Sequence, residues 1–234
     1  MLNFFKKTTR RKCDLQLLSV HIPKTAGTSF RMILNDAYGK ENVCRLDYNS
    51  KKNKVTVNEQ PYLEHALPDS YPIIHGHFIP RDVYAKFNID PAIPVITWLR
   101  HPVEQVISHY YYQVQLFQEA TIDKGVDVIR LQRTLLEFAA DPQIRNRSTR
   151  QLQGKDIDDY FYVGIVEQFD QDVQEIATLL GWKNIKRYTE NVTKMPRDPK
   201  VITDEVKAQI AEWNSTDMEL YNHVLSRKSK ESVS

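Results

Sequence analysis

Two kinds of apolar pattern alternate along the chain and predict units of strand, loop and helix. Leu15–His21 is a short aliphatic run followed by Pro23 and Gly27, which is typical of a buried strand that enters a loop. Phe30–Tyr38 then has apolar residues at helical spacing and stops at Gly39. The first part of the chain therefore predicts a strand, a loop and a helix.

The same unit recurs in the middle of the chain. Ile93–Leu99 is a second apolar run that ends at Arg100, and a helix is predicted from Val103 to about Phe117, with Pro102 at its first turn. A further short strand is expected at Pro72–His75. Repeated units of this kind favour a parallel sheet with right-handed crossovers.

The remaining segments complete a predicted three-layer α/β/α domain with a central, mainly parallel sheet. Helices are expected near Asp127–Ala140 and Gln168–Leu180, a strand at Tyr160–Val166, and a helical region at Thr203–Ser226. We expect one domain over residues 13–226, with flexible tails at 1–12 and 227–234. Two polar or irregular stretches are expected at the surface, and these are Asn49–Asn58 and Asn184–Lys200.

Composition restricts the function classes. The 234 residues are 41% hydrophobic and 26% charged, which excludes a disordered or disulfide-stapled chain. The net charge is +2, but five basic residues and no acids lie in the first twelve positions, so residues 13–234 carry a net charge of −3. Local anion pockets therefore fit better than a nucleic-acid surface.

The number of cysteines and the hydropathy of the chain indicate the cellular compartment in which the protein is expected. Cys13 and Cys44 are too few for a disulfide framework and too far apart for a CxxC motif. No run approaches the ~18 apolar residues of a membrane helix, and residues 1–12 lack the apolar core of a signal peptide. We expect a cytoplasmic protein without a transmembrane segment.

Ile22–Ser29, the loop before the first helix, has the composition of an anion cradle. Backbone N–H groups at a helix N-terminus favour negative charge, and Lys24 adds a full positive charge. The spacing is not that of the nucleotide-kinase loop, since Lys24 precedes Gly27 by three residues. A capped helix after a proline turn is the structural alternative.

Arg100 and Ser108 form the second candidate pair. Arg100 follows a strand at the edge where open α/β sheets bind ligands, and Ser108 lies on the next helix. A guanidinium can bind two phosphate oxygens, although an ordinary ion pair is the alternative. Farther along this helix, we expect the run Tyr110–Tyr112 to divide between the core and the edge of a cofactor.

Together the two loops resemble the cofactor signature of the sulfotransferases that use 3′-phosphoadenosine 5′-phosphosulfate (PAPS). The resemblance implies a P-loop-like fold and places Arg100 and Ser108 on the 3′-phosphate. It also implies a set of residues around the 5′-phosphosulfate, and these are Lys24, Thr25, Ala26, Gly27, Thr28 and Ser29.

The segment His75-Gly76-His77 is similar to the His-Gly-His segment of glycan 2-O-sulfotransferases that act on heparan and dermatan chains. The resemblance implies that His77 is the general base and that His75 is its neighbour, a second catalytic group or a substrate contact. A neutral imidazole can accept the proton of a sugar hydroxyl. Two structural histidines, or a metal site with a further ligand, are the alternatives.

Asn146–Gly154 is similar to an Asn-x-x-Thr-Arg-x-Leu-x-Gly stretch of the same enzymes. From this resemblance we expect acceptor contacts from Asn146 and Arg150, and we also expect one from Arg81. Lys194 and Arg197, in the late irregular stretch, are expected to cover the nucleotide.

The resemblance implies direct transfer of the sulfuryl group from PAPS to an acceptor hydroxyl, with 3′,5′-adenosine bisphosphate (PAP) leaving. The expected acceptor is a carbohydrate, the expected partners exclude nucleic acid, and no metal is required, because cations and helix dipoles take its place. The alternatives are a P-loop-like kinase or phosphotransferase, which would prefer ATP with magnesium, and a nucleotide-binding protein without turnover.

Overall fold

The computed structural model describes residues 14–118, 133–183, 185–186, 188 and 196–231. The strands are β1 (Leu17–Val20), β2 (Val43–Asn49), β3 (Lys54–Val57), β4 (Gln60–Pro61), β5 (Ile73–Gly76), β6 (Val95–Leu99) and β7 (Tyr162–Ile165). The α-helices are α1 (Gly27–Tyr38), α2 (Pro80–Phe87), α3 (Pro102–Gln118), α5 (Leu135–Ala139), α6 (Arg147–Gln151), α7 (Phe169–Leu179), α8 (Asp204–Trp213) and α9 (Ser215–Glu231). Short 3-10 helices are η1 (Lys40–Asn42), η2 (Ser50–Lys52), η4 (Ile157–Asp159) and η5 (Val166–Gln168).

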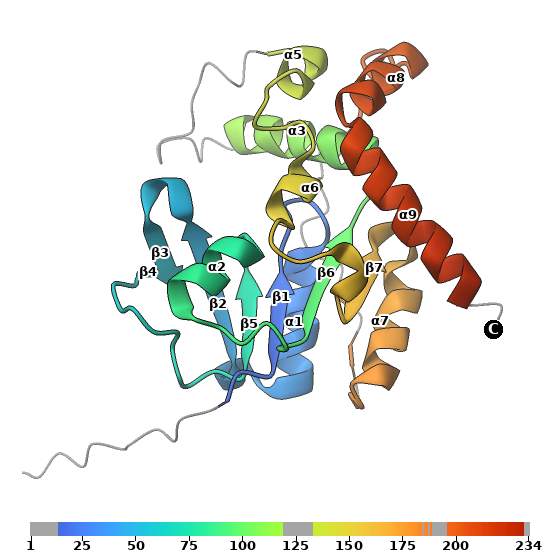
Figure 1. Cartoon of the computed structure of the whole chain (residues 1–234). Coiled ribbons are helices and arrows are strands. Elements are labelled where there is room, and N and C mark those ends of the chain that lie inside the picture. The colour runs from blue at the N-terminus through green and yellow to red at the C-terminus, as the bar shows by residue number, and fades with distance from the viewer. Residues whose placement is uncertain (1–13, 119–132, 184, 187, 189–195, 232–234) are drawn as a thin grey trace, which may run out of the picture.

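The strands form one sheet in the order β4-β3-β2-β5-β1-β6-β7 (Figure 1). Strands β2, β5, β1, β6 and β7 pair in parallel, while β3 and β4 extend the β2 edge in antiparallel orientation. In the central register, Leu18 of β1 lies opposite Ile74 of β5 and Val95 of β6. The predicted mainly parallel sheet is confirmed, and the carboxyl ends of its parallel strands meet at one edge.

Alternate residues along each strand pack into two separate clusters on opposite faces of the sheet. Leu17 packs with Phe30 of α1 and Ile176 of α7, whereas Leu18 packs with Val83 of α2 and Val224 of α9. All six side chains are buried. These two faces confirm the predicted three-layer α/β/α architecture.

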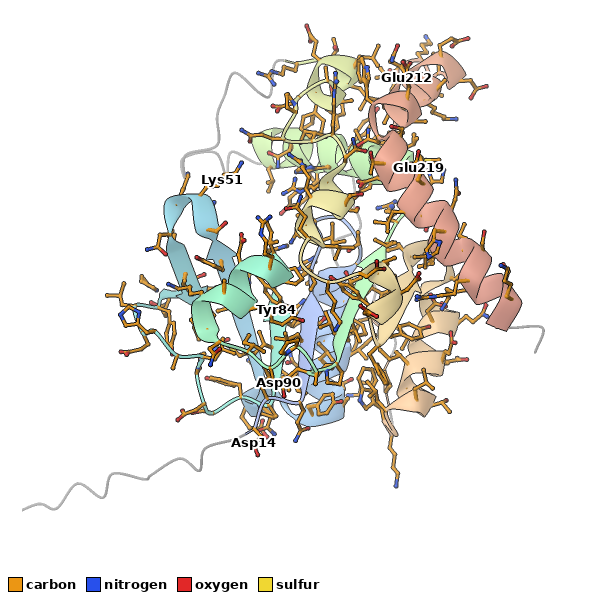
Figure 2. The ribbon with its side chains drawn as sticks, viewed as in Figure 1. Asp14, Lys51, Tyr84, Asp90, Glu212 and Glu219 are labelled. Atoms are coloured by element: carbon orange, nitrogen blue, oxygen red, sulfur yellow. The ribbon has the colours of Figure 1, made fainter. Side chains whose placement is uncertain are left out.

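A third cluster lies beyond the carboxyl edge of the sheet, where α3, α5 and α8 pack together (Figure 1). Ile107 of α3, Phe138 of α5 and Ile210 of α8 are buried in it. Figure 2 places Glu212 on the outer part of α8, well away from Lys51 at the tip of the β2–β3 hairpin. The helical lobe thus stands over the edge at which the parallel strands end.

Most predicted elements are present within a few residues of their expected bounds. The predicted helix Asp127–Ala140 and the predicted surface stretch Asn49–Asn58 differ from the structure. The predicted helix Asp127–Ala140 lies partly outside the described residues, and its described part is α5, which Thr134 caps. The excursion Asn49–Asn58 contains β3, because Val55 is buried against the sheet.

The predicted boundary at residue 226 is wrong, because α9 continues to Glu231. The Lys228 ammonium group lies 3.2 Å from the buried carboxylate of Asp172 and 3.1 Å from the half-exposed carboxylate of Glu175. The last turn of α9 is therefore held against α7. The predicted helical region Thr203–Ser226 consists of two helices, α8 and α9, which are separated at Asn214. The Asn214 side chain accepts a hydrogen bond from the Asn146 N–H. The predicted tail over residues 1–12 lies outside the described residues.

Candidate functional site

A cleft of about 880 Å³ opens at the carboxyl edge of the parallel strands. Its lining comes from the segments that follow β1, β5, β6 and β7, and from one face of α3. The structure brings most predicted site residues to this cleft, and these are Lys24, Ala26, Gly27, Thr28, Ser29, His75, His77, Arg100, Ser108 and Arg197.

The loop between β1 and α1 presents backbone donors to the cleft. Lys24 (φ 68°) and Ala26 (φ 58°) both adopt left-handed backbone conformations, which are costly for residues with a Cβ atom. Ala26 is the N-cap of α1 and supplies no side-chain hydrogen bond, and the first turn contains no acidic residue. The start of α1 therefore has the uncapped N–H groups and positive dipole end that bind anions.

Gly27 is required where the loop meets the preceding strand. A Cβ atom at this position would collide with the imidazole ring of His21. Thr25 is buried, and its hydroxyl donates to the Ile22 carbonyl at 2.8 Å. The predicted contact of Thr25 with a phosphosulfate is therefore not supported, since its side chain holds the loop together and does not line the cleft.

One face of α3 is directed at this loop. Gln105 Nε2 donates to the Pro23 carbonyl at 2.9 Å, and both Ser108 and Tyr112 line the cleft one and two turns farther along. Before the helix, Arg100 Nη1 donates to the Lys24 carbonyl at 3.4 Å. Burial and the nearby Arg197 lower the pKa of Arg100. Arg100, the cation expected at the end of β6, is therefore partly desolvated where it contacts the β1–α1 loop.

Lys24 is the most perturbed cation of the cleft. Burial, followed by repulsion from Arg100, lowers the pKa of Lys24 to about 8. Its ammonium group lies 3.9 Å from the ring centroid of Tyr112. Among the described residues, no acidic side chain forms an ion pair with Lys24.

Three histidine rings form a stack beside the loop. The ring of His21 stacks on that of His77 with centroids 4.1 Å apart, and on that of His75 with centroids 5.2 Å apart. His21 follows β1 directly, whereas the other two residues lie on and after β5, the neighbouring strand. Within the described part of the chain, no cluster of histidine, cysteine and acidic side chains is arranged to hold a metal ion.

His77 has a defined tautomer. Its Nδ1 lies 2.7 Å from the His21 carbonyl oxygen, which can only accept, so Nδ1 carries the proton and Nε2 is free to accept one. The backbone N–H of His77 donates to Asp47 Oδ1 at 3.0 Å. Burial lowers the pKa of His77, although Asp47 opposes this shift. The imidazole is therefore neutral at pH 7 and suited to accept a proton.

His75 is more deeply buried, with 2% of its surface exposed. Its Nδ1 lies 2.8 Å from the Ser19 hydroxyl, and burial lowers its pKa to about 3. Burial and the other two histidines lower the pKa of His21 well below its ordinary value. His77 is thus the histidine of the stack with the most favourable base strength.

Three predicted acceptor contacts lie outside the cleft lining. Arg81 is exposed and pairs with Asp82 at 3.1 Å. The Asn146 side chain accepts from the Asp217 N–H, and Arg150 donates to the carbonyls of Asn146 and Gln143. Asn146 and Arg150 therefore hold neighbouring segments together, whereas Arg81 pairs with the adjacent residue of α2, and the acceptor contacts of all three stay predictions. Lys194 lies outside the described residues.

Several cleft residues were not assigned a role from the sequence. His21, Arg31 and Arg45 line the cleft, and Arg45 pairs with Asp47 and Glu59. The sequence marks these residues only as polar side chains in or beside predicted elements. His21 follows β1, Arg45 lies on β2 and Arg31 lies on α1. The expected division of the tyrosine run is confirmed for two members, since Tyr111 is buried and Tyr112 lines the cleft.

The sequence of this chain is similar to those of known sulfotransferases. Residues 7–224 match the family described as the sulfotransferase family. Heparan sulfate 2-O-sulfotransferase 1 of Homo sapiens and of Gallus gallus are each 30% identical to this chain over 108 residues, which is 42% of this chain. The match spans only 29% of the length of either relative.

The crystal structure of mouse sulfotransferase SULT7A1 complexed with PAP is similar with a TM-score of 0.45 and 13% identity, covering 88% of this chain and 67% of the mouse chain. In the part of the chain that the structure describes, no helix is both long and apolar enough to span a bilayer.

Proposed function

Because this chain belongs to the sulfotransferase family, we propose that it transfers the sulfuryl group of PAPS to a hydroxyl group of a carbohydrate acceptor and releases PAP. The observation that carries the proposal is the placement of two cation-bearing anion sites on one cleft. The uncapped start of α1 with Lys24 forms the first, and Arg100 with Ser108 forms the second. A nucleotide with phosphate groups at both its 5′ and 3′ positions requires two such sites.

The residues present fit this donor. Lys24 and the α1 N–H groups would hold the 5′-phosphosulfate, because they offer positive charge and backbone donors at one point. Arg100 and Ser108 would hold the 3′-phosphate, with Arg197 beside them. When bound, PAPS supplies an activated sulfuryl group and a phosphate leaving group.

The remaining chemistry belongs to this chain. His77 Nε2 accepts the proton of the acceptor hydroxyl while the oxygen forms its bond to sulfur. Lys24 and the loop N–H groups stabilise the negative charge that develops on the leaving phosphate oxygen, and fixed donors of this kind are a large catalytic contribution. The proton ends on His77, and the electron pair of the broken S–O bond ends on PAP.

His21 is the second candidate for the base, because it lines the same cleft and stacks on His77. His77 is preferred for two reasons. Its Nδ1 is fixed by the His21 carbonyl, which leaves Nε2 as the acceptor. The pKa of His21 is held far below its ordinary value by burial and by its two histidine neighbours, so its ring is the weaker base.

The carbohydrate acceptor is supported by the names of the relatives, which are sulfotransferases of heparan sulfate. Arg31 and Arg45 also line the cleft near His75, and Arg45 is paired with Asp47 and Glu59. Arg31 would favour an acceptor that carries a negatively charged group.

A transfer assay tests the proposal. Purified full-length protein is incubated with radiolabelled PAPS and a panel of desulfated glycans, and label in the glycan is measured for wild type, His77→Ala and His21→Ala. We expect transfer by wild type, almost none by His77→Ala, and partial activity for His21→Ala. PAP binding without transfer to any glycan would overturn the carbohydrate acceptor, and the absence of PAP binding would overturn the sulfotransferase activity itself.

A further inference from the structure

Tyr112 contacts the ammonium group of Lys24 from the opposite wall of the cleft. The two groups come from different elements, since Lys24 belongs to the β1–α1 loop and Tyr112 to the third turn of α3. The ammonium nitrogen lies 3.9 Å from the ring centroid, within the range of a cation–π interaction. Both residues line the cleft.

Both ends of Lys24 are thus held from the β6–α3 side. Arg100 contacts its backbone carbonyl, and Tyr112 contacts its ammonium group. Gln105 fixes the preceding residue of the loop through the Pro23 carbonyl at 2.9 Å. Because the Lys24 backbone is in the left-handed region, these contacts also support a costly conformation.

An aromatic ring is suited to hold this particular cation. A carboxylate in the same place would neutralise the ammonium group and would repel an incoming phosphate. The negative face of an aromatic ring attracts the cation but adds no net charge, so the full positive charge remains available to the nucleotide. Lys24 needs such support, because it is partly desolvated and lies near Arg100.

We propose that Tyr112 is a positioning residue for Lys24. The Tyr112 ring holds the ammonium group of Lys24 charged and directed into the cleft before the nucleotide binds. This inference rests on the proposed function, in which Lys24 binds the 5′ phosphate group of the donor. It adds Tyr112 to the residues that determine nucleotide affinity, although Tyr112 acts through Lys24.

Calorimetric titration of the full chain with PAP tests the inference on three variants. Tyr112→Phe keeps the aromatic face and should bind PAP like wild type. Tyr112→Leu keeps apolar volume but loses the ring, and should bind roughly 2- to 30-fold more weakly, the range that corresponds to a cation–π contact. Tyr110→Leu is the matched control, because Tyr110 packs on Phe138 in the helical lobe and should leave PAP affinity unchanged.

Two further readouts separate positioning from a structural effect. In a Lys24→Ala background, Tyr112→Leu should cause no additional loss of PAP affinity, since the ring then has no cation to hold. The pH at which PAP affinity declines on the alkaline side should be lower in Tyr112→Leu than in wild type, because the ring favours the charged form of Lys24.

Equal PAP affinities of Tyr112→Leu and wild type, or equal losses in Tyr112→Phe and Tyr112→Leu, would overturn the role of Tyr112. So would an undiminished effect of Tyr112→Leu in the Lys24→Ala background. A wild-type protein that does not bind PAP would instead overturn the proposed function, so the two failures are distinguishable.

Discussion

Two helix starts in this protein use their polar groups in opposite ways. At the start of α1, the N-cap residue Ala26 supplies no side-chain hydrogen bond to the backbone N–H groups, and the adjoining Lys24 has an aromatic ring as its neighbour. At the start of α6, the N–H groups of Ser148 and Thr149 both donate to the buried carboxylate of Asp217, at 2.9 and 2.8 Å. Both segments match sequence patterns of the same enzymes, but one faces the cleft and the other is tied to α9.

The difference shows how an anion site is distinguished from a structural joint. A binding site retains donors and charge for a ligand, whereas a structural joint satisfies its donors internally. By this criterion the β1–α1 loop is the binding region and α6 is a support for the helical lobe. Variants at the two places should therefore affect different measurements.

The largest effect is expected at the proposed base. His77→Ala should reduce turnover by roughly 100- to 10,000-fold, the usual contribution of general acid–base catalysis. PAP affinity should stay within about twofold of wild type, because His77 is not among the proposed phosphate contacts. Turnover with saturating PAPS and calorimetric PAP titration measure the two quantities.

The pH profile gives an independent check on the same group. His77 acts as a base only when neutral, so activity should fall as the pH drops through its pKa. Burial lowers this pKa, and the acid limb should therefore have its midpoint below the ordinary value of about 6.5. A midpoint clearly above 6.5, or near-normal turnover of His77→Ala, would refute His77 as the base.

Lys24→Ala should reduce turnover by about 100- to 1,000-fold and should also weaken PAP binding, since one charge serves both purposes. Lys155→Ala is the matched control, because Lys155 donates to the Pro91 carbonyl and lies outside the cleft lining. A Lys24→Ala variant with unchanged PAP affinity would show that the loop does not bind the phosphate groups.

At the structural joint, Asp217→Ala should lower the free energy of unfolding by about 3 kcal/mol, because it leaves the α6 donors unsatisfied in a buried place. PAP affinity of the folded protein should change little. Chemical denaturation followed by PAP titration of the same samples tests both statements. A loss of PAP affinity that exceeds the loss of folded protein would assign α6 to the nucleotide site.

The smallest effect is expected for Arg150→Ala. Arg150 donates to two backbone carbonyls and lies outside the cleft lining, so the free energy of unfolding should change by less than about 1 kcal/mol. Neither PAP affinity nor transfer to the best glycan should change more than about twofold. A selective rise in the KM for the glycan would restore Arg150 as an acceptor contact.

The sequence predicted those parts of the fold that depend on local patterns. Strands β1 and β6 are short and apolar or nearly so, and Pro23 follows β1 by three residues while Arg100 follows β6 directly. Their loops and following helices were predicted from the same residues. Strand β2 was not predicted, because Arg45 and Asp47 interrupt its apolar residues. Its strand conformation depends on pairing with the neighbouring strands β3 and β5.

The same limit applies to the candidate site. Lys24 and Arg100 could be predicted because each lies in a motif at a strand end, and the sheet topology then brings them together. The importance of His21 depends on His75 and His77, which are more than fifty positions away in the sequence and adjacent only in the fold. The support that Asp217 gives to α6 is equally remote, so Asn146 and Arg150 could not be recognised as structural from their own segment.

The most direct test of the central claim is calorimetric titration of the wild-type protein and of Arg100→Ala with PAP and, separately, with ATP and magnesium. We predict micromolar binding of PAP to the wild type, loss of that binding in Arg100→Ala, and weak binding of ATP with magnesium to both proteins. Preference for ATP with magnesium, or PAP binding that does not depend on Arg100, would contradict the assignment of the cleft as a PAPS site.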